Sequence, residues 1–264
     1  MISVTLLLAF ALASATAGAV PKLVVLTPSV PSAESVTLLE ASCAALASQY
    51  AKHLCLVLRE PHLSSDEIVR LVKALRPLFP AAGSLAVHEK CADARRIAKE
   101  YGLCLHLSSV AAWSDERAAF DGPLGVSAHS EAEVRLAAEC GVQWAFLSPV
   151  ARPTSKPGDV RPPIGEEAVL RAQRAWPDID IVALGGISPA STARLVSRGC
   201  RAVAVLGGVF CDGPETRPEV ACAAAADFCD VLVAASTGAA AAGVPVDEHV
   251  HDHEDSTSEP YEGP

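Results

Sequence analysis

The chain has 264 residues, of which 50% are hydrophobic and 20% are charged, so it can bury the core of one large domain or two small ones. This composition excludes a chain that is disordered throughout. The net charge is −10, but seven acidic residues lie after residue 246, and the rest of the chain carries −3. Because no basic surface is indicated, nucleic acid is not expected as a partner.

Residues 1–19 form an apolar leader that ends in small residues. The pairs Ala15–Ala17 and Ala17–Ala19 are typical of a signal-peptide cleavage site, whereas no Lys or Arg precedes the apolar stretch. The stretch is too short to span a bilayer, so no membrane contact is expected for the mature protein. Two hypotheses stay open: a cleaved signal peptide, which would direct the chain to the secretory pathway or an organelle, or a fortuitous leader on a cytoplasmic protein.

Eight short apolar runs follow along the chain, and each is predicted to form a strand. They are Leu23–Thr27, Leu54–Arg59, Ser84–His88, Leu103–Leu107, Leu124–Ser127, Trp144–Ser148, Ile179–Gly185 and Ala202–Leu206. They lack strict alternation of apolar and polar residues, which is typical of parallel strands covered by helices.

Amphipathic segments with helix-capping signals separate these runs. Ser65 begins an apolar-periodic segment that extends to Leu78, and Ser130 precedes another with Glu133 at capping-box spacing. Ser188 and Pro189 begin a segment that ends at Gly199. Eight strands alternating with eight helical segments predict an α/β fold, a single-domain (β/α)8 TIM barrel over residues 21–233. A doubly wound sheet is the alternative, although the first strand lacks the glycine-rich turn of that fold.

The chain changes character after the barrel. Residues 234–264 read as a small-residue linker and an acidic tail that cannot bury enough apolar surface to fold, so a disordered tail is expected. The alternating His249, His251 and His253 could bind a metal weakly or simply be solvated. The nine cysteines are dispersed without a CxxC pair, which indicates buried thiols rather than a disulfide framework or a zinc site.

In a barrel of this kind, reactive groups come from the C-terminal ends of the strands. Arg59 and Lys156 could face this mouth and bind an anionic group, or be exposed loop charges. His129 could act as a general acid or base near neutral pH, or cap the following helix. His106 lies in an apolar run, which favours a buried histidine with satisfied hydrogen bonds.

Two glycine pairs follow the last two predicted strands. Gly185–Gly186 directly precedes a predicted helix, and Gly207–Gly208 follows the eighth strand. Glycine lets the backbone approach a ligand closely, and amide groups at the start of a helix attract anions. The two pairs together predict a phosphate site at the mouth of the barrel.

At these residues the sequence resembles the thiamine phosphate synthase/TenI superfamily. The resemblance rests on Gly125 to Ser130, Gly141 to Gly158, Ala183 to Ile187 and Ala202 to Leu206, with shorter matches at Leu58–Glu60 and Leu105–Leu107. It implies a barrel of thiamine metabolism that binds a small phosphorylated thiazole, and it leaves a homo-oligomer open. The synthase of this superfamily joins hydroxymethylpyrimidine pyrophosphate to thiazole phosphate with Mg²⁺ and releases pyrophosphate; the TenI-like branch is a metal-independent thiazole tautomerase.

The resemblance also implies roles for individual residues. Arg59, Ser155 and Lys156 would hold pyrophosphate, Ser127 would lie beside the reacting ring, and the glycines would bind the thiazole phosphate. His129 would move a proton in a tautomerase.

The departures from the synthase pattern gather on the pyrimidine and magnesium side. They are Val57, Pro61, His88 to Lys90 in place of Asn-Asp-Arg, Ser108–Ser109, Ala111 and Pro153. Glu89 then stands as the one metal candidate at these positions, whereas a magnesium ion usually needs several oxygen ligands. The sequence therefore favours a tautomerase without a cofactor. The alternatives are a synthase with Mg²⁺ and a catalytically degenerate barrel that binds a phosphorylated ligand.

Overall fold

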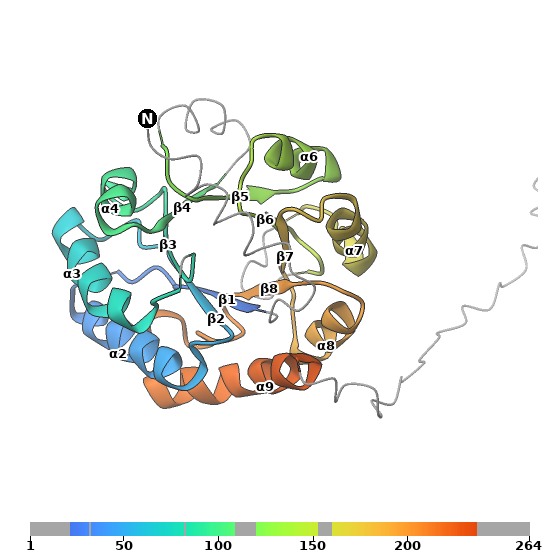
Figure 1. Cartoon of the computed structure of the whole chain (residues 1–264). Coiled ribbons are helices and arrows are strands. Elements are labelled where there is room, and N and C mark those ends of the chain that lie inside the picture. Colours follow the sequence, from blue (N-terminus) through green and yellow to red (C-terminus); the bar gives the residue numbers. More distant parts are fainter. Residues whose placement is uncertain (1–21, 32, 82, 109–119, 153–159, 237–264) are drawn as a thin grey trace, which may run out of the picture.

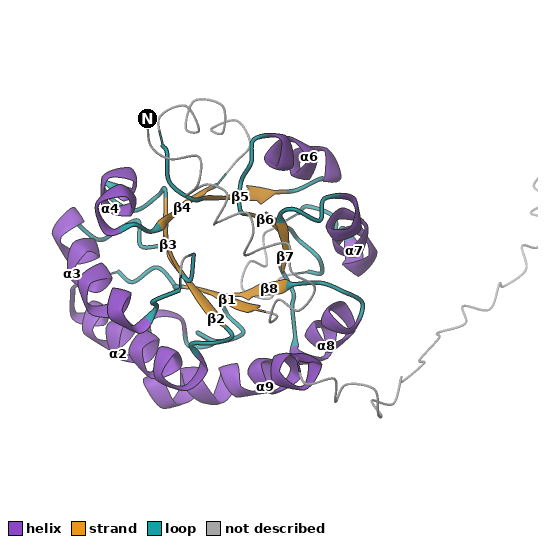
Figure 2. Cartoon of the chain, in the orientation of Figure 1, coloured by secondary structure: helices purple, strands orange, loops and turns teal. Residues whose placement is uncertain are grey.

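The computed structural model describes residues 22–31, 33–81, 83–108, 120–152 and 160–236, and these fold into a closed barrel. Eight parallel strands pair in chain order, and β8 closes on β1 (Figures 1 and 2). The strands are β1 (Lys22–Leu26), β2 (Leu54–Leu58), β3 (Leu85–His88), β4 (Cys104–Leu107), β5 (Leu124–Ala128), β6 (Trp144–Leu147), β7 (Asp180–Leu184) and β8 (Ala202–Val205). All eight predicted strands are present, each end within one residue of its expected position.

Helices form an outer ring around the strands (Figure 2). Within the described residues they are α2 (Ala33–Tyr50), α3 (Ser65–Leu75), α4 (Ala94–Tyr101), α6 (Glu131–Glu139), α7 (Gly165–Ala175), α8 (Pro189–Ser197) and α9 (Pro218–Ser236). Short 3-10 turns occur at Arg76–Leu78 and Gly213–Glu215. The TIM barrel is confirmed, and the closed sheet rules out the doubly wound alternative. The predicted boundary at residue 234 is wrong by three residues, because α9 continues through Ser236. Residues 1–21, most of the link between β4 and β5, and residues 237–264 of the predicted tail lie outside the described residues.

Local sequence signals set several helix ends. Ser64 caps α3 through a complete capping box with Glu67, and Pro77 ends the α-helix by making its last turn 3-10. Ser188 and Pro189 begin α8 as predicted. At α6 the expected box is incomplete: Ser130 accepts from the Glu133 amide, but the Glu133 carboxylate accepts from the His129 amide instead.

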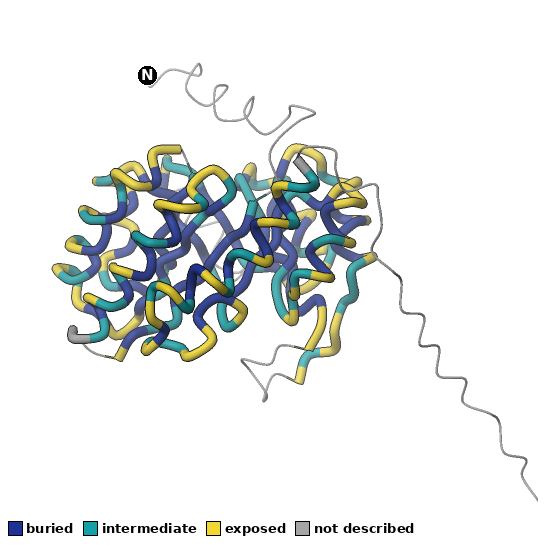
Figure 3. The backbone as a smooth tube through the Cα atoms, turned by 90° about the horizontal axis from the view of Figure 1, so that it is seen from below, coloured by how far each residue is buried: buried dark blue, intermediate teal, exposed yellow. Residues whose placement is uncertain are grey.

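Strand residues alternate between two hydrophobic layers. Figure 3 shows the buried residues in dark blue through the interior and exposed residues in yellow toward the outside. In β1, Leu23 and Val25 pack outward under the helices, whereas Val24 and Leu26 belong to the cluster inside the barrel. All nine cysteines are free thiols, and six of them are buried, as predicted; Cys55 and Cys140 are partly buried and Cys211 is exposed. No helix in the described residues combines the length and apolar character needed to cross a membrane.

Candidate active site at the mouth of the barrel

The predicted site residues follow the strands at one end of the barrel, because parallel strands in a closed sheet share the same direction. Strand ends bring together Arg59, Glu89, Ser127, His129, Gly185, Gly186, Gly207 and Gly208. Ser155 and Lys156 lie outside the described residues.

His129 is an exposed residue directly after β5, and its ring is held by neighbouring groups. Nδ1 lies 2.9 Å from the carbonyl oxygen of Ser148, at the end of β6, and 3.2 Å from the Ser148 hydroxyl. A carbonyl accepts and cannot donate, so a hydrogen bond to Ser148 places the ring hydrogen on Nδ1, and Nε2 then holds the lone pair of the neutral ring. The Ser148 carbonyl thus orients the imidazole with Nε2 as its basic nitrogen.

Arg161 is a candidate site residue that sequence reasoning missed. Its Nη1 atom lies 2.7 Å from Nδ1 and 2.8 Å from Nε2 of His129. A guanidinium only donates, so with the hydrogen on Nδ1 its hydrogen bond goes to the lone pair of Nε2. Arg161 is half-buried in the loop between β6 and α7. A planar guanidinium can bind a carboxylate or a phosphate through two hydrogen bonds. The signal that could have found it is a basic residue on the loop that follows β6.

The loop that carries Arg161 is closed at its base. The amides of Ile164 and Gly165 donate to the carbonyls of Pro149 and Val150, at 2.9 and 3.0 Å. The amides of Val150 and Ala151 in turn donate to the carbonyls of Leu184 and Gly185, both at 2.9 Å. The loops after β6 and β7 are therefore hydrogen-bonded to each other.

The contact between the loops after β6 and β7 requires glycine at the first predicted glycine pair. Gly185 and Gly186 have φ values of +94° and +65°, which favour glycine. A Cβ on Gly186 would lie 2.7 Å from the Cβ of Ala151, and one on Gly185 would lie 3.0 Å from Pro149. Within the described residues, the amides of Gly186, Gly207 and Gly208 donate to no backbone carbonyl. These amides are candidate donors to an anion.

Ser127 and His106 lie inside the barrel, below the mouth. His106 is 1% exposed, which confirms the predicted buried histidine, and its Nε2 atom lies 3.1 Å from the Ser127 hydroxyl oxygen. Burial, and then the neighbouring His88, hold the pKa of His106 well below its usual value, so the ring is neutral. The contact with Ser127 was not foreseen from sequence.

Glu60 has a structural role beside the candidate anion residue Arg59. Its fully buried carboxylate accepts hydrogen bonds from the amides of Ser29, at 3.3 Å, and Val30, at 2.5 Å. Desolvation raises the pKa of Glu60, and these hydrogen bonds partly oppose the shift. The amide of Arg59 donates to Thr27 at 2.8 Å. Glu60 thus fastens the loop after β1 to the end of β2.

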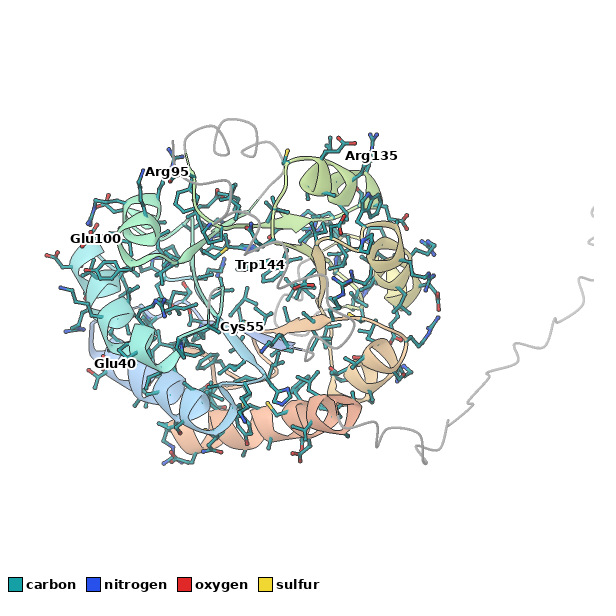
Figure 4. The ribbon with its side chains drawn as sticks, in the orientation of Figure 1. Glu40, Cys55, Arg95, Glu100, Arg135 and Trp144 are labelled. Atoms are coloured by element: carbon teal, nitrogen blue, oxygen red, sulfur yellow. The ribbon has the colours of Figure 1, made fainter. Side chains whose placement is uncertain are left out.

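A small cavity of about 50 Å³ lies at the opposite end of the barrel. Its lining includes Lys22, Cys55, Gly83, Trp144 and Asp180, which stand at or near the starts of strands. Figure 4 shows Cys55 and Trp144 inside the ring of strands, whereas Glu40, Arg95, Glu100 and Arg135 lie on the outer helices. This cavity is not at the end where the candidate catalytic residues gather.

Comparison with known proteins identifies the family. Residues 23–209 match the family described as thiamine monophosphate synthase. The chain belongs to the thiamine monophosphate synthase family. Thiamine-phosphate synthase of Moorella thermoacetica is 34% identical over 58% of this chain and 72% of its own length. The synthase of Geobacillus kaustophilus is 30% identical over 69% of this chain and 70% of its own length.

A solved structure agrees with the family at the level of the fold. Thiamine phosphate pyrophosphorylase of Pyrococcus furiosus aligns with a TM-score of 0.59 and 19% identity, over 83% of this chain and 99% of its own. At this identity the likeness concerns the barrel alone. The sequence resemblance to the superfamily is thus confirmed by the family match and the curated relatives.

Magnesium, which a synthase of the family implies, does not fit the side chains in the described part of the chain. The carboxylate of Glu89 accepts hydrogen bonds from the amide of Ser108, at 2.9 Å, and from its hydroxyl. Among the described residues no three His, Cys, Asp or Glu side chains gather into a possible metal site. The Glu89 carboxylate instead connects the ends of β3 and β4 through these hydrogen bonds.

Proposed function

We propose that this member of the thiamine monophosphate synthase family is an enzyme of thiamine biosynthesis that isomerises a thiazole carboxylate phosphate, with His129 as the proton-transfer group. The observation that carries the proposal is the orientation of His129. The Ser148 carbonyl fixes the hydrogen on Nδ1, and Nε2 lies beside Arg161 at the mouth of the barrel. An oriented imidazole near neutral pH is suited to general acid–base catalysis.

The neighbouring groups complete the proposed site. The amides of Gly186, Gly207 and Gly208, at the ends of β7 and β8, would bind the phosphate. Arg161 would bind the substrate carboxylate. When the substrate carboxylate binds the guanidinium of Arg161, Nε2 of His129 loses its hydrogen bond to that guanidinium. Nε2 can then remove a proton from the thiazole and return it at another atom.

A second candidate function is thiamine-phosphate synthesis. It is favoured by the names of the curated relatives, which are 30–34% identical over 70–72% of their own length. In a synthase, Arg59, Ser155 and Lys156 would bind the pyrophosphate of the pyrimidine substrate. Arg59 is half-buried and directly follows β2.

The test measures both reactions on the full chain, each with and without Mg²⁺. We expect metal-independent isomerisation of thiazole carboxylate phosphate and its reduction by at least about 100-fold in His129→Ala. His53→Ala is the matched control, because His53 precedes β2 at the opposite end of the barrel and should leave the rate unchanged.

Other outcomes contradict the proposal in distinct ways. Pyrophosphate release that requires Mg²⁺ and both substrates would establish the synthase. Calorimetric binding of the thiazole phosphate without turnover in either assay would establish a degenerate barrel that binds a phosphorylated ligand.

A further inference from the structure

Three polar side chains form a hydrogen-bonded chain inside the barrel. The indole Nε1 atom of Trp144 lies 3.2 Å from Nδ1 of His106, and Nε2 of His106 lies 3.1 Å from the hydroxyl oxygen of Ser127. The three residues come from β6, β4 and β5, respectively. They connect the base of the barrel, where Trp144 lines the small cavity, to the level of the candidate site.

A glycine makes these hydrogen bonds between Trp144, His106 and Ser127 possible. Gly125 of β5 is in register with His106 on one side and with Trp144 on the other, so it separates the two residues. A Cβ on Gly125 would lie 2.1 Å from Nε1 of Trp144. Because that atom is missing, the indole extends across β5 and stacks near His106, with ring centroids 6.4 Å apart.

The direction of each hydrogen bond follows from the chemistry of the groups. An indole N–H donates and cannot accept, so Nδ1 of His106 must present its lone pair to Trp144. The buried ring is neutral, and its one hydrogen therefore sits on Nε2. Nε2–H then donates to the Ser127 oxygen, which leaves the serine's own hydrogen free to point elsewhere.

We infer that Trp144 and His106 are positioning residues that direct the hydroxyl hydrogen of Ser127 toward the ligand. Ser127 is half-buried on the inner face of β5, two residues above Gly125 on the side of the mouth. It would donate to a ligand atom with a lone pair, such as a heteroaromatic ring nitrogen or a carboxylate oxygen. This inference rests on the proposed function for the placement of the ligand beside Ser127.

The same geometry excludes one reading of the Ser127–His106 pair. A serine beside a histidine resembles a nucleophile with its general base. Here the lone pair of His106 faces Trp144 and the hydrogen faces Ser127, so His106 cannot accept the serine proton. Successive donation along such a chain polarises each bond and strengthens the last donor.

The first experiment reads the position of the hydrogen directly. Nitrogen-15 NMR of the histidine rings in the full chain, with the His106 signals assigned by their loss in His106→Gln, reports which nitrogen is protonated. We expect Nε2–H and no titration between about pH 6 and pH 8. Protonation at Nδ1, or a cationic ring in that range, would overturn the inference.

Removing the indole donor should release this constraint. In Trp144→Phe we expect a mixture of the two His106 tautomers, because Nδ1 loses its donor. Trp176→Phe is the matched control, since Trp176 packs against the outer core, and it should leave the tautomer unchanged. An unaltered single tautomer in Trp144→Phe would show that the indole does not determine the tautomer of His106. If this variant fails to fold, the wild-type spectrum still decides.

Kinetics separate positioning from simple packing. In His106→Gln the amide nitrogen can reach the place of Nε2 and donate to Ser127, whereas the shorter Asn cannot. We expect kcat/KM for thiazole isomerisation to fall roughly tenfold in His106→Asn and to recover in His106→Gln, the size of one neutral hydrogen bond. Equal losses in both variants would contradict positioning. An inactive wild type would refute the proposed function alone, because the tautomer measurement needs no turnover.

Discussion

The two halves of the barrel interior are built from different chemistry. The half formed by β7, β8, β1 and β2, here called the apolar half, is lined mainly by aliphatic side chains: Val182, Ala202, Ala204, Val24, Leu26 and Val57. The half formed by β3 to β6, here called the polar half, contains His88, His106, Ser127 and Trp144 beside Ala86, Cys104 and Phe146. The polar half is the one that leads to His129 and Arg161 at the mouth.

This difference shows how one small core serves two purposes. Aliphatic side chains stabilise the barrel by burial, at about 25 cal/mol per Å² of apolar surface. Buried polar groups add little net stability, but they specify geometry when they are hydrogen-bonded. Substitutions of the aliphatic side chains that line the apolar half should therefore change stability alone, and those of the hydrogen-bonded side chains in the polar half should change activity.

The largest expected effect is at Gly125, which lies between His106 and Trp144 in the sheet. Gly125→Ala should destabilise the protein by about 3 kcal/mol, because the new methyl overlaps the Trp144 indole. Gly102→Ala is the control: nothing lies within 4 Å of its Cβ, and a φ of +61° should cost only about 1 kcal/mol. Urea denaturation measures both. Equal losses, or no relief of the Gly125→Ala loss in a Trp144→Leu background, would contradict the overlap.

The next prediction compares one residue from each half. Val182→Ala in the apolar half should lower the free energy of unfolding by about 2 kcal/mol, because buried methyl groups are lost and a cavity remains, while kcat/KM holds. Ser127→Ala should change stability by less than about 1 kcal/mol and lower kcat/KM at least tenfold. Denaturation curves and the isomerisation assay on the same samples check the pair. The reverse pattern would refute the division between the halves.

The smallest expected effects are opposite pH dependences at two buried groups. The raised pKa of Glu60 means that the folded protein keeps this proton above pH 4.5, where the unfolded chain loses it. The free energy of unfolding should therefore fall as pH rises from 4.5 through the raised pKa. Denaturation across this range should show a flatter profile in Glu60→Gln; identical slopes in both proteins would be inconsistent with a buried titrating carboxyl.

The contribution of His106 to the pH dependence of the free energy of unfolding has the opposite sign. Its lowered pKa means that the unfolded chain takes up a proton below pH 6.5 while the folded ring stays neutral, so stability should be lost as pH falls below 6.5. His106→Gln cannot titrate and should lose less stability over that range. A wild type and variant that decline in parallel would show that His106 is charged in the fold.

Features set by local sequence were predictable. The strands follow from short apolar runs, and Ser188 with Pro189 marks the start of α8 by its own chemistry. The candidate residues at strand ends followed from the barrel rule together with the family resemblance. Thus the fold, and the place of His129 and Ser127 within it, could be read from the sequence.

The contacts that orient the site could not be predicted in this way. Trp144 and His106 are 38 residues apart, and His106 and Ser127 are 21 apart, so their meeting depends on strand register and on the missing side chain of Gly125. The Glu133 carboxylate was expected to complete a capping box, but it bonds the His129 amide. Arg161 lies 32 residues from His129, on a loop whose path the sequence does not specify.

The closed base of the loop between β6 and α7 has a consequence for ligand affinity. Four backbone hydrogen bonds tie this loop to itself and to the glycine turn after β7. The conformational entropy of aligning the loop base with that turn is therefore lost when the chain folds, rather than when a ligand arrives. In the proposed function, a phosphate at Gly186 and a carboxylate at Arg161 would meet two anchors whose spacing is already limited, so the site would select ligands by the distance between their two anionic groups.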